Sequence, residues 1–163
     1  MKNRSKGWVL ITGASSGIGA ALARKFAAED FDLILTARRS NKLYELKHEL
    51  QNVKIVVLPM DLATDNGADQ LCRDIEEAGL SVDILINNAA AISDLQFVDT
   101  TRQGLDQMMT LNMTSVAKLT HHFLPTMLKR RSGKILNIGS LASLHPIPSM
   151  ALYAATKAFI LSL

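Results

Sequence analysis

Tyr153 and Lys157 stand four residues apart in a segment of helical period, so a helix would place both side chains on one face. A phenol, with a pKa of about 10, is a weak acid–base catalyst at neutral pH. A neighbouring ammonium favours the phenolate and lowers that pKa. The pair therefore indicates proton transfer through a tyrosine, although such pairs also occur by chance on ordinary helix surfaces.

The glycines of Thr12–Gly19 form a second group, which suits phosphate binding. Their sequence, Thr-Gly-Ala-Ser-Ser-Gly-Ile-Gly, runs from an apolar stretch directly into a helical segment. Such a loop presents backbone N–H groups and the positive end of a helix to a diphosphate. Gly13 allows the tight turn, Gly17 lets the backbone approach a ligand, and Gly19 lets the helix pack against the strand. The spacing differs from the commoner Gly-x-Gly-x-x-Gly fingerprint, but its place after a first strand favours phosphate binding over an ordinary turn.

Arg38 and Arg39 follow the second apolar run, where an acidic residue would hydrogen-bond an adenosine ribose and select NAD. That acid is missing, and a planar guanidinium suits a 2′-phosphate because it donates two charge-assisted hydrogen bonds. Such bonds are worth roughly ten- to a hundred-fold in affinity, so the sequence predicts NADP(H) over NAD(H). The other interpretation is that an arginine only solvates the start of the next helix, which suits Arg39 better than Arg38.

Five short apolar runs must position these groups, and they show the continuous burial pattern of strands covered on both faces of a parallel sheet. They are Trp8–Thr12, Phe31–Thr36, Val53–Leu58, Val82–Ile86 and Lys134–Ile138. Segments of helical period alternate with them, over 17–29, 40–51, 64–79, 100–130 and 150–163. This alternation implies right-handed crossovers. It predicts a single doubly wound α/β domain of Rossmann type over 1–163, with strand order 3-2-1-4-5.

The last helical segment reaches Leu163 without a glycine, asparagine or polar tail to close it. Two complete mononucleotide-binding halves would supply six strands rather than five. We therefore expect a chain cut short, lacking the last strands of such a fold. The alternative is a natural five-strand domain whose last helix frays.

Composition excludes several classes of protein. Of the 163 residues 48% are apolar and 20% charged, which is typical of a globular domain rather than a disordered chain. The net charge of +3 is spread along the sequence, so no nucleic-acid partner is expected. No stretch approaches the ~20 apolar residues of a membrane span, so no membrane partner is expected either.

The single cysteine, Cys72, excludes an internal disulfide and a cysteine-based zinc site. It favours a reducing compartment, and we expect the cytoplasm. The histidines offer no metal site, because His121 and His122 are adjacent and point apart on a helix. His48 and His145 have no carboxylate cluster nearby in the sequence.

Taken together, the motifs resemble the short-chain dehydrogenase/reductase family in its classical branch. The resemblance is carried by Thr12-Gly13-x-x-x-Gly17-Ile18-Gly19, Asn87-Asn88-Ala89, Ser140 and Tyr153-x-x-x-Lys157, in this order, and extends from Trp8 to Leu163. It implies a hydride transfer with NADPH that interconverts a carbonyl and an alcohol. It also implies two further strands and a loop over the substrate, which family chains carry after the position of Leu163.

The resemblance also implies roles for single residues. Tyr153 would exchange a proton with the substrate oxygen, Ser140 would hydrogen-bond that oxygen, and Lys157 would lower the pKa of the tyrosine and hold the nicotinamide ribose. Asn112 matches the family asparagine that positions a water on the proton relay, although a polar residue in mid-helix can also cause only a local bend. The cofactor-binding residues implied by the resemblance and by the two arginines are Gly13, Ser15, Ser16, Gly17, Ile18, Gly19, Arg38, Arg39, Asp61, Leu62, Asn88, Ala89, Ala90, Tyr153 and Lys157.

Two of these positions carry alternatives. The resemblance assigns Asp61 to the adenine amino group and Leu62 to the edge of the base, but Asp61 could equally cap the helix that begins near Thr64. The family usually has glycine where this chain has Ala90, so an added methyl group would narrow the approach to the ribose.

The leading hypothesis is an NADP(H)-dependent carbonyl reductase or alcohol dehydrogenase acting on a small molecule. The alternative is a truncated nucleotide-binding or dimerising fragment without turnover. A non-enzymatic interaction protein on the same fold is disfavoured because Ser140, Tyr153 and Lys157 are all present. The apolar faces of 100–130 and 150–163 predict a homodimer. The sequence leaves the substrate open.

Overall fold

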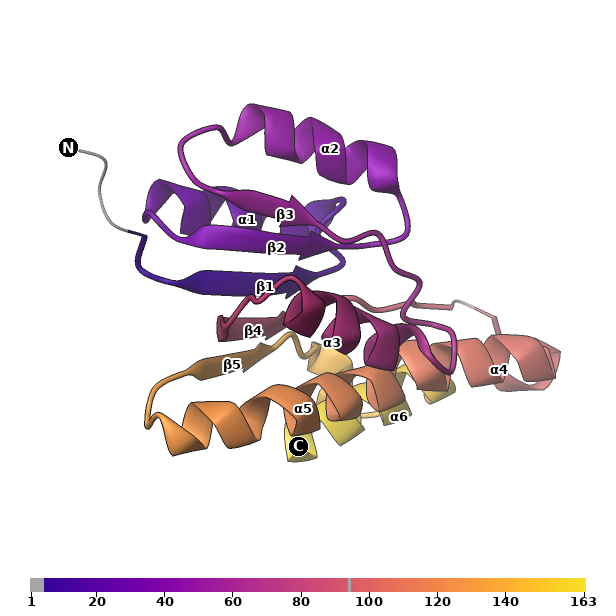
Figure 1. Ribbon diagram of the computed structural model, residues 1–163. Helices are drawn as coiled ribbons and strands as arrows, with labels where there is room; N and C mark the ends of the chain where they lie inside the picture. Colours follow the sequence, from indigo (N-terminus) through magenta and orange to yellow (C-terminus); the bar gives the residue numbers. More distant parts are fainter. Residues whose placement is uncertain (1–4, 94) are drawn as a thin grey trace.

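Five parallel strands form one sheet in the order β3-β2-β1-β4-β5 (Figure 1). The computed structural model describes residues 5–93 and 95–163. The strands are β1 Trp8–Thr12, β2 Asp32–Thr36, β3 Ile55–Val57, β4 Val82–Asn87 and β5 Lys134–Asn137. The predicted Rossmann-type fold and strand order are confirmed, and each predicted strand overlaps an observed one.

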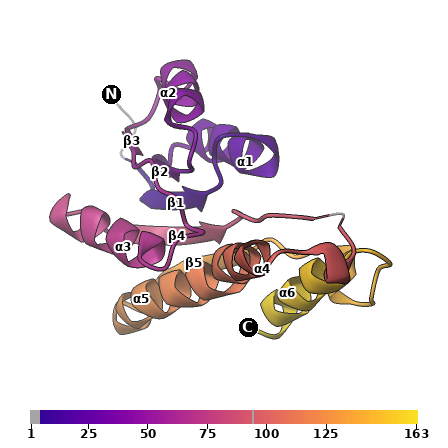
Figure 2. The same cartoon turned by 90° about the vertical axis from the view of Figure 1, so that its right-hand side faces the viewer.

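Helices cover both faces of this sheet, as Figure 2 shows. They are α1 Gly17–Ala28, α2 Ser40–Glu49, α3 Gly67–Glu77, α4 Arg102–Met109, α5 Ser115–Lys129 and α6 Ala151–Ser162. One apolar core lies between the sheet and the pair α1 and α2, and a second lies between the opposite face and the pair α3 and α5. Alternate residues of β1 serve the two cores, since Val9 faces the first and Leu10 the second.

The predicted helix over 100–130 is wrong in one respect, because it is not one regular helix. A π-helical turn, Thr110–Thr114, separates α4 from α5. The turn contains Asn112, whose side chain is 1% exposed and bonds to backbone outside the helix. Wider turns of this kind are rare and frequently lie at functional sites.

The prediction that all five strands are covered on both faces fails for β5. Most residues of β1, β2 and β4 are buried, and those of β3 are buried or half-buried, but β5 alternates between exposed and half-buried residues, and Leu136 is 42% exposed. Within the described residues β5 pairs only with β4 and forms one edge of the sheet. Its outer edge and one face are therefore open to solvent.

No helix in the described part of the chain is long and apolar enough to cross a membrane.

Candidate functional site

The loop between β1 and α1 is built around its glycines. Gly13 has a φ of +67°, and a Cβ there would lie 2.9 Å from the backbone of Ala89. A Cβ on Gly19 would lie 2.5 Å from the carbonyl oxygen of Gly13, so the first turn of α1 closes directly on the loop. Ser16 precedes α1, and no side chain among the described residues caps the helix there. The N–H groups at this positive helix end are thus suited to an anion.

The residues that follow β4 hold this loop in place by hydrogen bonds. The Thr12 hydroxyl oxygen accepts hydrogen bonds from the backbone N–H groups of Asn88 and Ala89, both at 2.9 Å. The Asn88 side chain donates to the carbonyl oxygens of Thr12 and Gly13, at 2.8 and 3.3 Å. Part of the function of Asn88 is therefore structural. Thr12 belonged to the quoted motif but was not predicted as a site residue.

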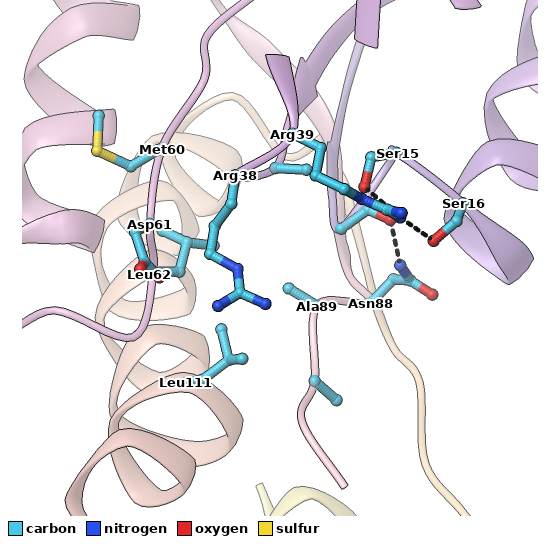
Figure 3. Close-up of a pocket in the computed structure, with 13 residues that line it drawn as sticks. Ser15, Ser16, Arg38, Arg39, Met60, Asp61, Leu62, Asn88, Ala89 and Leu111 are labelled. Atoms are coloured by element: carbon cyan, nitrogen blue, oxygen red, sulfur yellow. Dashed lines mark hydrogen bonds between the residues drawn. The ribbon is translucent and has the colours of Figure 1, made fainter. Parts of the chain in front are cut away.

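A cleft of about 290 Å³ opens at this edge of the sheet (Figure 3). It is lined by the ends of β1, β2, β3 and β4, where ligands of doubly wound sheets bind. The predicted cofactor residues that line it are Gly13, Ser15, Ser16, Arg38, Arg39, Asp61, Leu62, Asn88, Ala89 and Ala90. Ala37, Met60 and Leu111 line it as well and were missed, since small and apolar residues carry no chemical signal in the sequence.

Five predicted cofactor residues lie outside the lining of this cleft. They are Gly17, Ile18, Gly19, Tyr153 and Lys157. The three residues of α1 sit directly behind the loop, with Ile18 57% exposed and Gly19 buried against Gly13. Tyr153 and Lys157 belong to α6, which is joined to the β4 exit by hydrogen bonds through Asn112 and Thr156.

The two arginines have different surroundings. The Arg39 guanidinium donates to the hydroxyl oxygens of Ser15 and Ser16, at 3.2 and 2.8 Å, which draws it over the glycine loop. In Figure 3 the Arg38 guanidinium extends into the middle of the cleft, towards Ala89 and Leu111. Arg38 therefore reaches into the cleft itself, whereas Arg39 lines it while bonded to the serines of the loop. Together they give this end of the cleft positive charge.

Asp61 forms a local turn rather than a helix cap. One carboxylate oxygen accepts a hydrogen bond from the backbone N–H of Ala63 at 2.9 Å. The predicted helix start near Thr64 is too early, because α3 begins at Gly67 and its N-cap residue is Asn66. Asp61 and Leu62 both line the cleft, but Leu62 is almost completely buried, with 3% of its surface exposed.

Tyr153 and Lys157 share one face of α6, as the spacing predicted. The Lys157 ammonium nitrogen lies 5.9 Å from the centre of the Tyr153 ring and donates to the carbonyl oxygen of Ile138 at 2.7 Å. Lys157 is 5% exposed, and this burial lowers the pKa of its ammonium below the ordinary value. Lys157 is thus a buried cation whose environment disfavours its charge, which is common at functional sites.

Ser140 lies where β5 gives way to a short 3-10 turn, Leu141–Ser143. Its hydroxyl oxygen accepts a hydrogen bond from the N–H of Ala142 at 3.2 Å, which leaves the hydroxyl proton for another partner. The turn packs against α6, so the exit of β5 and the Tyr153 face are neighbours. Tyr153 itself lines a small pocket of about 10 Å³ with Leu95, Phe97 and other residues.

Asn112 is held at the π-turn by three hydrogen bonds. Its side-chain oxygen accepts from the N–H of Ala91 at 2.8 Å. Its amide nitrogen donates to the Ala91 carbonyl oxygen at 2.9 Å and to the Thr156 hydroxyl oxygen at 3.1 Å. Asn112 therefore does more than bend a helix, since it joins the β4 exit to α6.

His122 belongs to α5 and contacts α3. The imidazole of His122 is 3.1 Å from a carboxylate oxygen of Glu76, on the α3–α5 side. No group of three or more histidine, cysteine, aspartate or glutamate side chains within the described ranges could hold a metal ion.

Comparison with protein families gives one match that covers nearly the whole chain. The family model described as "short chain dehydrogenase" matches residues 7–163. Among curated proteins, a very-long-chain 3-oxoacyl-CoA reductase of Pyricularia oryzae is 36% identical over 159 residues, covering 94% of this chain and 48% of that protein. Sulfoacetaldehyde reductase 2 of Chromohalobacter salexigens is 37% identical, covering 93% of this chain and 62% of the relative.

Solved structures show the same similarity. A short-chain dehydrogenase from Sphingobium yanoikuyae in complex with NADPH superposes with a TM-score of 0.90 at 37% identity. The match covers 96% of this chain and 62% of that one. The chain thus spans about half to two thirds of the length of these relatives.

Proposed function

The chain belongs to the short-chain dehydrogenase family. We propose that it is the dinucleotide-binding part of an NADP(H)-dependent oxidoreductase that interconverts a carbonyl and an alcohol. One observation carries this proposal. Ala89 and Ala90, which follow β4, line the cleft beside the glycine loop, and the next residue, Ala91, is joined to α6 by hydrogen bonds through the side chains of Asn112 and Thr156. A cofactor bound in the cleft would extend towards the proton-handling residues. Residues 1–163 would act as one dinucleotide-binding domain.

The cleft fits a dinucleotide phosphate on physical grounds. Its loop holds no side chain at Gly13 and Gly19, the α1 helix end above it is positively polarised, and two guanidinium groups flank it. Arg38 and Arg39 would hold the 2′-phosphate, which favours NADP(H) over NAD(H). The adenosine would lie against Asp61 and Leu62. The other residues assigned to the cofactor are Ser15, Ser16, Gly17, Ile18, Asn88, Ala89, Ala90, Tyr153 and Lys157.

When bound, the nicotinamide would supply the hydride that carbonyl reduction needs. In the proposed reaction Tyr153 donates its phenolic proton to the substrate oxygen as the alcohol forms. Ser140 donates a hydrogen bond to the same oxygen and stabilises its developing charge. The Lys157 ammonium favours the phenolate that Tyr153 becomes. Asn112 is assigned to the proton relay.

Three further proposals concern the oligomeric state, the compartment and the substrate of the protein. We propose a homodimer through α5 and α6, because Leu124, Leu128 and Leu161 are 39%, 66% and 61% exposed on these helices. A monomer in light scattering would contradict it. The buried, single Cys72 suits a reducing compartment such as the cytoplasm. The substrate would be a small molecule, since the described residues that line the pocket at Tyr153 are apolar or uncharged polar ones and include no basic side chain.

A second function has a specific observation in its favour. The β5 strand is open, and several large apolar side chains near Ser140 and Tyr153 are exposed, namely Ile92, Leu95, Phe97, Val98, Leu141 and Leu144. A nucleotide-binding or dimerising fragment without turnover is consistent with a substrate side that is open in this way. The two functions differ in turnover and agree in nucleotide binding.

The test is NADPH oxidation by the 163-residue chain with a panel of aldehydes and ketones, beside Tyr153→Phe. We expect carbonyl-dependent loss of NADPH absorbance in the native chain, and a loss of about 10²- to 10⁴-fold in the variant. Equal rates in both proteins would rule out the tyrosine mechanism. NADPH binding without turnover on any carbonyl would favour the fragment.

A further inference from the structure

Thr156 lies on α6 between Tyr153 and Lys157, with no exposed surface. Its hydroxyl donates to the carbonyl oxygen of Tyr153 at 2.8 Å and accepts from the Asn112 amide nitrogen at 3.1 Å. A threonine hydroxyl has one proton to donate, and here that proton goes to the residue that carries the phenol. The hydroxyl therefore both donates and accepts a hydrogen bond within a buried interface.

The hydrogen-bond chain continues to the central sheet. The side chain of Asn112 exchanges two bonds with the backbone of Ala91, at 2.8 and 2.9 Å. Ala91 follows β4, close to the segment that braces the glycine loop. The path from Ala91 through Asn112 and Thr156 therefore connects the β4 exit with the first turn of α6.

A second tie leaves the same helix in a different direction. Lys157 donates to the carbonyl oxygen of Ile138 at 2.7 Å, beyond the end of β5. Neighbouring residues of an α-helix project about 100° apart, so Thr156 and Lys157 reach two different strand exits. No side chain within the described ranges caps the start of α6 at Met150. The rotation of α6 about its axis is thus fixed by two bonds from adjacent residues.

We propose that Thr156 is a positioning residue, which acts through Asn112 to hold the first turn of α6 and with it the Tyr153 hydroxyl at the reacting position. This role rests on the function proposed above. A β-branched side chain keeps its hydroxyl in few rotamers, so Thr156 presents the oxygen to Asn112 with little freedom. Without the bond, α6 would pivot about the Lys157–Ile138 contact and carry the phenol away from Ser140.

The first test compares Thr156→Val, which keeps the shape and removes the hydroxyl, with Thr156→Ser, which keeps the hydroxyl. A displacement of about 1 Å costs about a hundred-fold in rate, so we expect kcat to fall roughly 10- to 100-fold in Thr156→Val. The KM for NADPH should stay within about threefold, since the cleft is untouched. Thr156→Ser should recover most of kcat.

Thr120→Val is the matched control. The Thr120 hydroxyl also accepts a bond from a buried asparagine, from the Asn87 amide nitrogen at 3.2 Å, but it lies on α5 away from Tyr153. The Thr120→Val variant should lose thermal stability, as Thr156→Val does, but keep the kcat of the native chain. The proposal is overturned if Thr156→Val keeps its kcat, if Thr156→Ser fails to restore it, or if both valine variants lose activity in proportion to their unfolded fraction.

Hydrogen exchange supplies a readout that needs no turnover. With the tie removed, the hydrogen-bonded amides of 154–157 and of Ala91 should exchange about tenfold faster in Thr156→Val than in the native chain, and at the native rate in Thr156→Ser and Thr120→Val. Unchanged exchange in Thr156→Val would overturn the tie. Absence of turnover in the native chain would contradict the proposed function. Hydrogen exchange would then still show whether Thr156 holds the first turn of α6.

Discussion

The carboxyl edge of the sheet is built in two different ways at its two sides. Beside β1, β2 and β3 the loops close around a cleft of about 290 Å³, and Thr12, Asn88 and Arg39 link neighbouring loops by hydrogen bonds. Beside β5 the strand is exposed, and Leu141 and Leu144 are 76% and 69% exposed.

The difference between these sides shows how binding and chemistry can be divided within one fold. On the β1–β3 side, the glycine backbone and side-chain hydrogen bonds between neighbouring loops shape the cleft. On the β5 side, the residues assigned to the reaction depend on ties between elements, such as the Lys157–Ile138 bond. Cofactor affinity should therefore respond to changes in the first side, and turnover to changes in the second.

The largest expected effect comes from Tyr153→Phe. Removal of the phenolic proton should lower turnover about 10²- to 10⁴-fold, while NADPH affinity changes no more than about threefold. Steady-state rates and calorimetric titration of the same preparation measure both quantities. A parallel loss of NADPH affinity would show that the two sides are not separable.

Gly19→Ala should have the opposite signature. The added Cβ would lie 2.5 Å from the Gly13 carbonyl oxygen, and displacement of the loop should weaken NADPH binding roughly 10- to 100-fold, by about 1–3 kcal/mol. Gly104→Ala is the control, because its Cβ would meet only side-chain atoms, the nearest at 3.2 Å. Unaltered NADPH affinity in Gly19→Ala would contradict the assignment of the loop.

The two arginines give a smaller and more selective effect. Arg38→Ala and Arg39→Ala should each weaken NADPH binding about tenfold, as one or two charged hydrogen bonds are lost. NADH, which has no 2′-phosphate, should bind each variant as it binds the native chain. Calorimetric titration with both nucleotides measures this, and an equal loss for NADH would remove the basis for the NADP preference.

Lys157→Met tests the β5 side through the pH dependence of the unfolding free energy. Among the four predictions it should give the smallest effect. Burial lowers the Lys157 pKa in the folded chain, so the unfolded chain binds more protons between the folded and the unfolded pKa. The unfolding free energy of the native chain should therefore rise with pH through this alkaline range. Chemical denaturation at several pH values should show that rise, and Lys157→Met should lack it. An identical pH dependence in both proteins would contradict the buried cation.

The sequence predicted the first side better than the second. Glycine spacing and the order of apolar runs are local signals, and they sufficed for the loop and the strand order. The cleft residues that follow β3 and β4 were predicted only through the family resemblance. Leu111 and Met60 left no signal, because they enter the cleft only through folding. The contact of Arg39 with the glycine loop could not be predicted, because the two serines that bond to it lie more than twenty residues away in the sequence.

On the second side the residue types were predictable from the sequence, but little of the geometry was. The four-residue spacing correctly placed Tyr153 and Lys157 on one face. The π-turn at Asn112 and the exposure of β5 were missed, because both depend on what packs around these segments. Thr156 carried no motif that marked it, and its importance lies in contacts with residues distant in the chain.

Calorimetric titration of the 163-residue chain with NADPH, and with NADH for comparison, tests the central claim most directly. The account predicts saturable NADPH binding at micromolar concentration, with NADH at least about tenfold weaker because it lacks the phosphate held by the arginines. Absence of binding by both nucleotides would contradict the claim that the β1–β3 side forms a cofactor site by itself. Equal affinity for NADPH and NADH would support the cofactor site but contradict its preference for NADP(H).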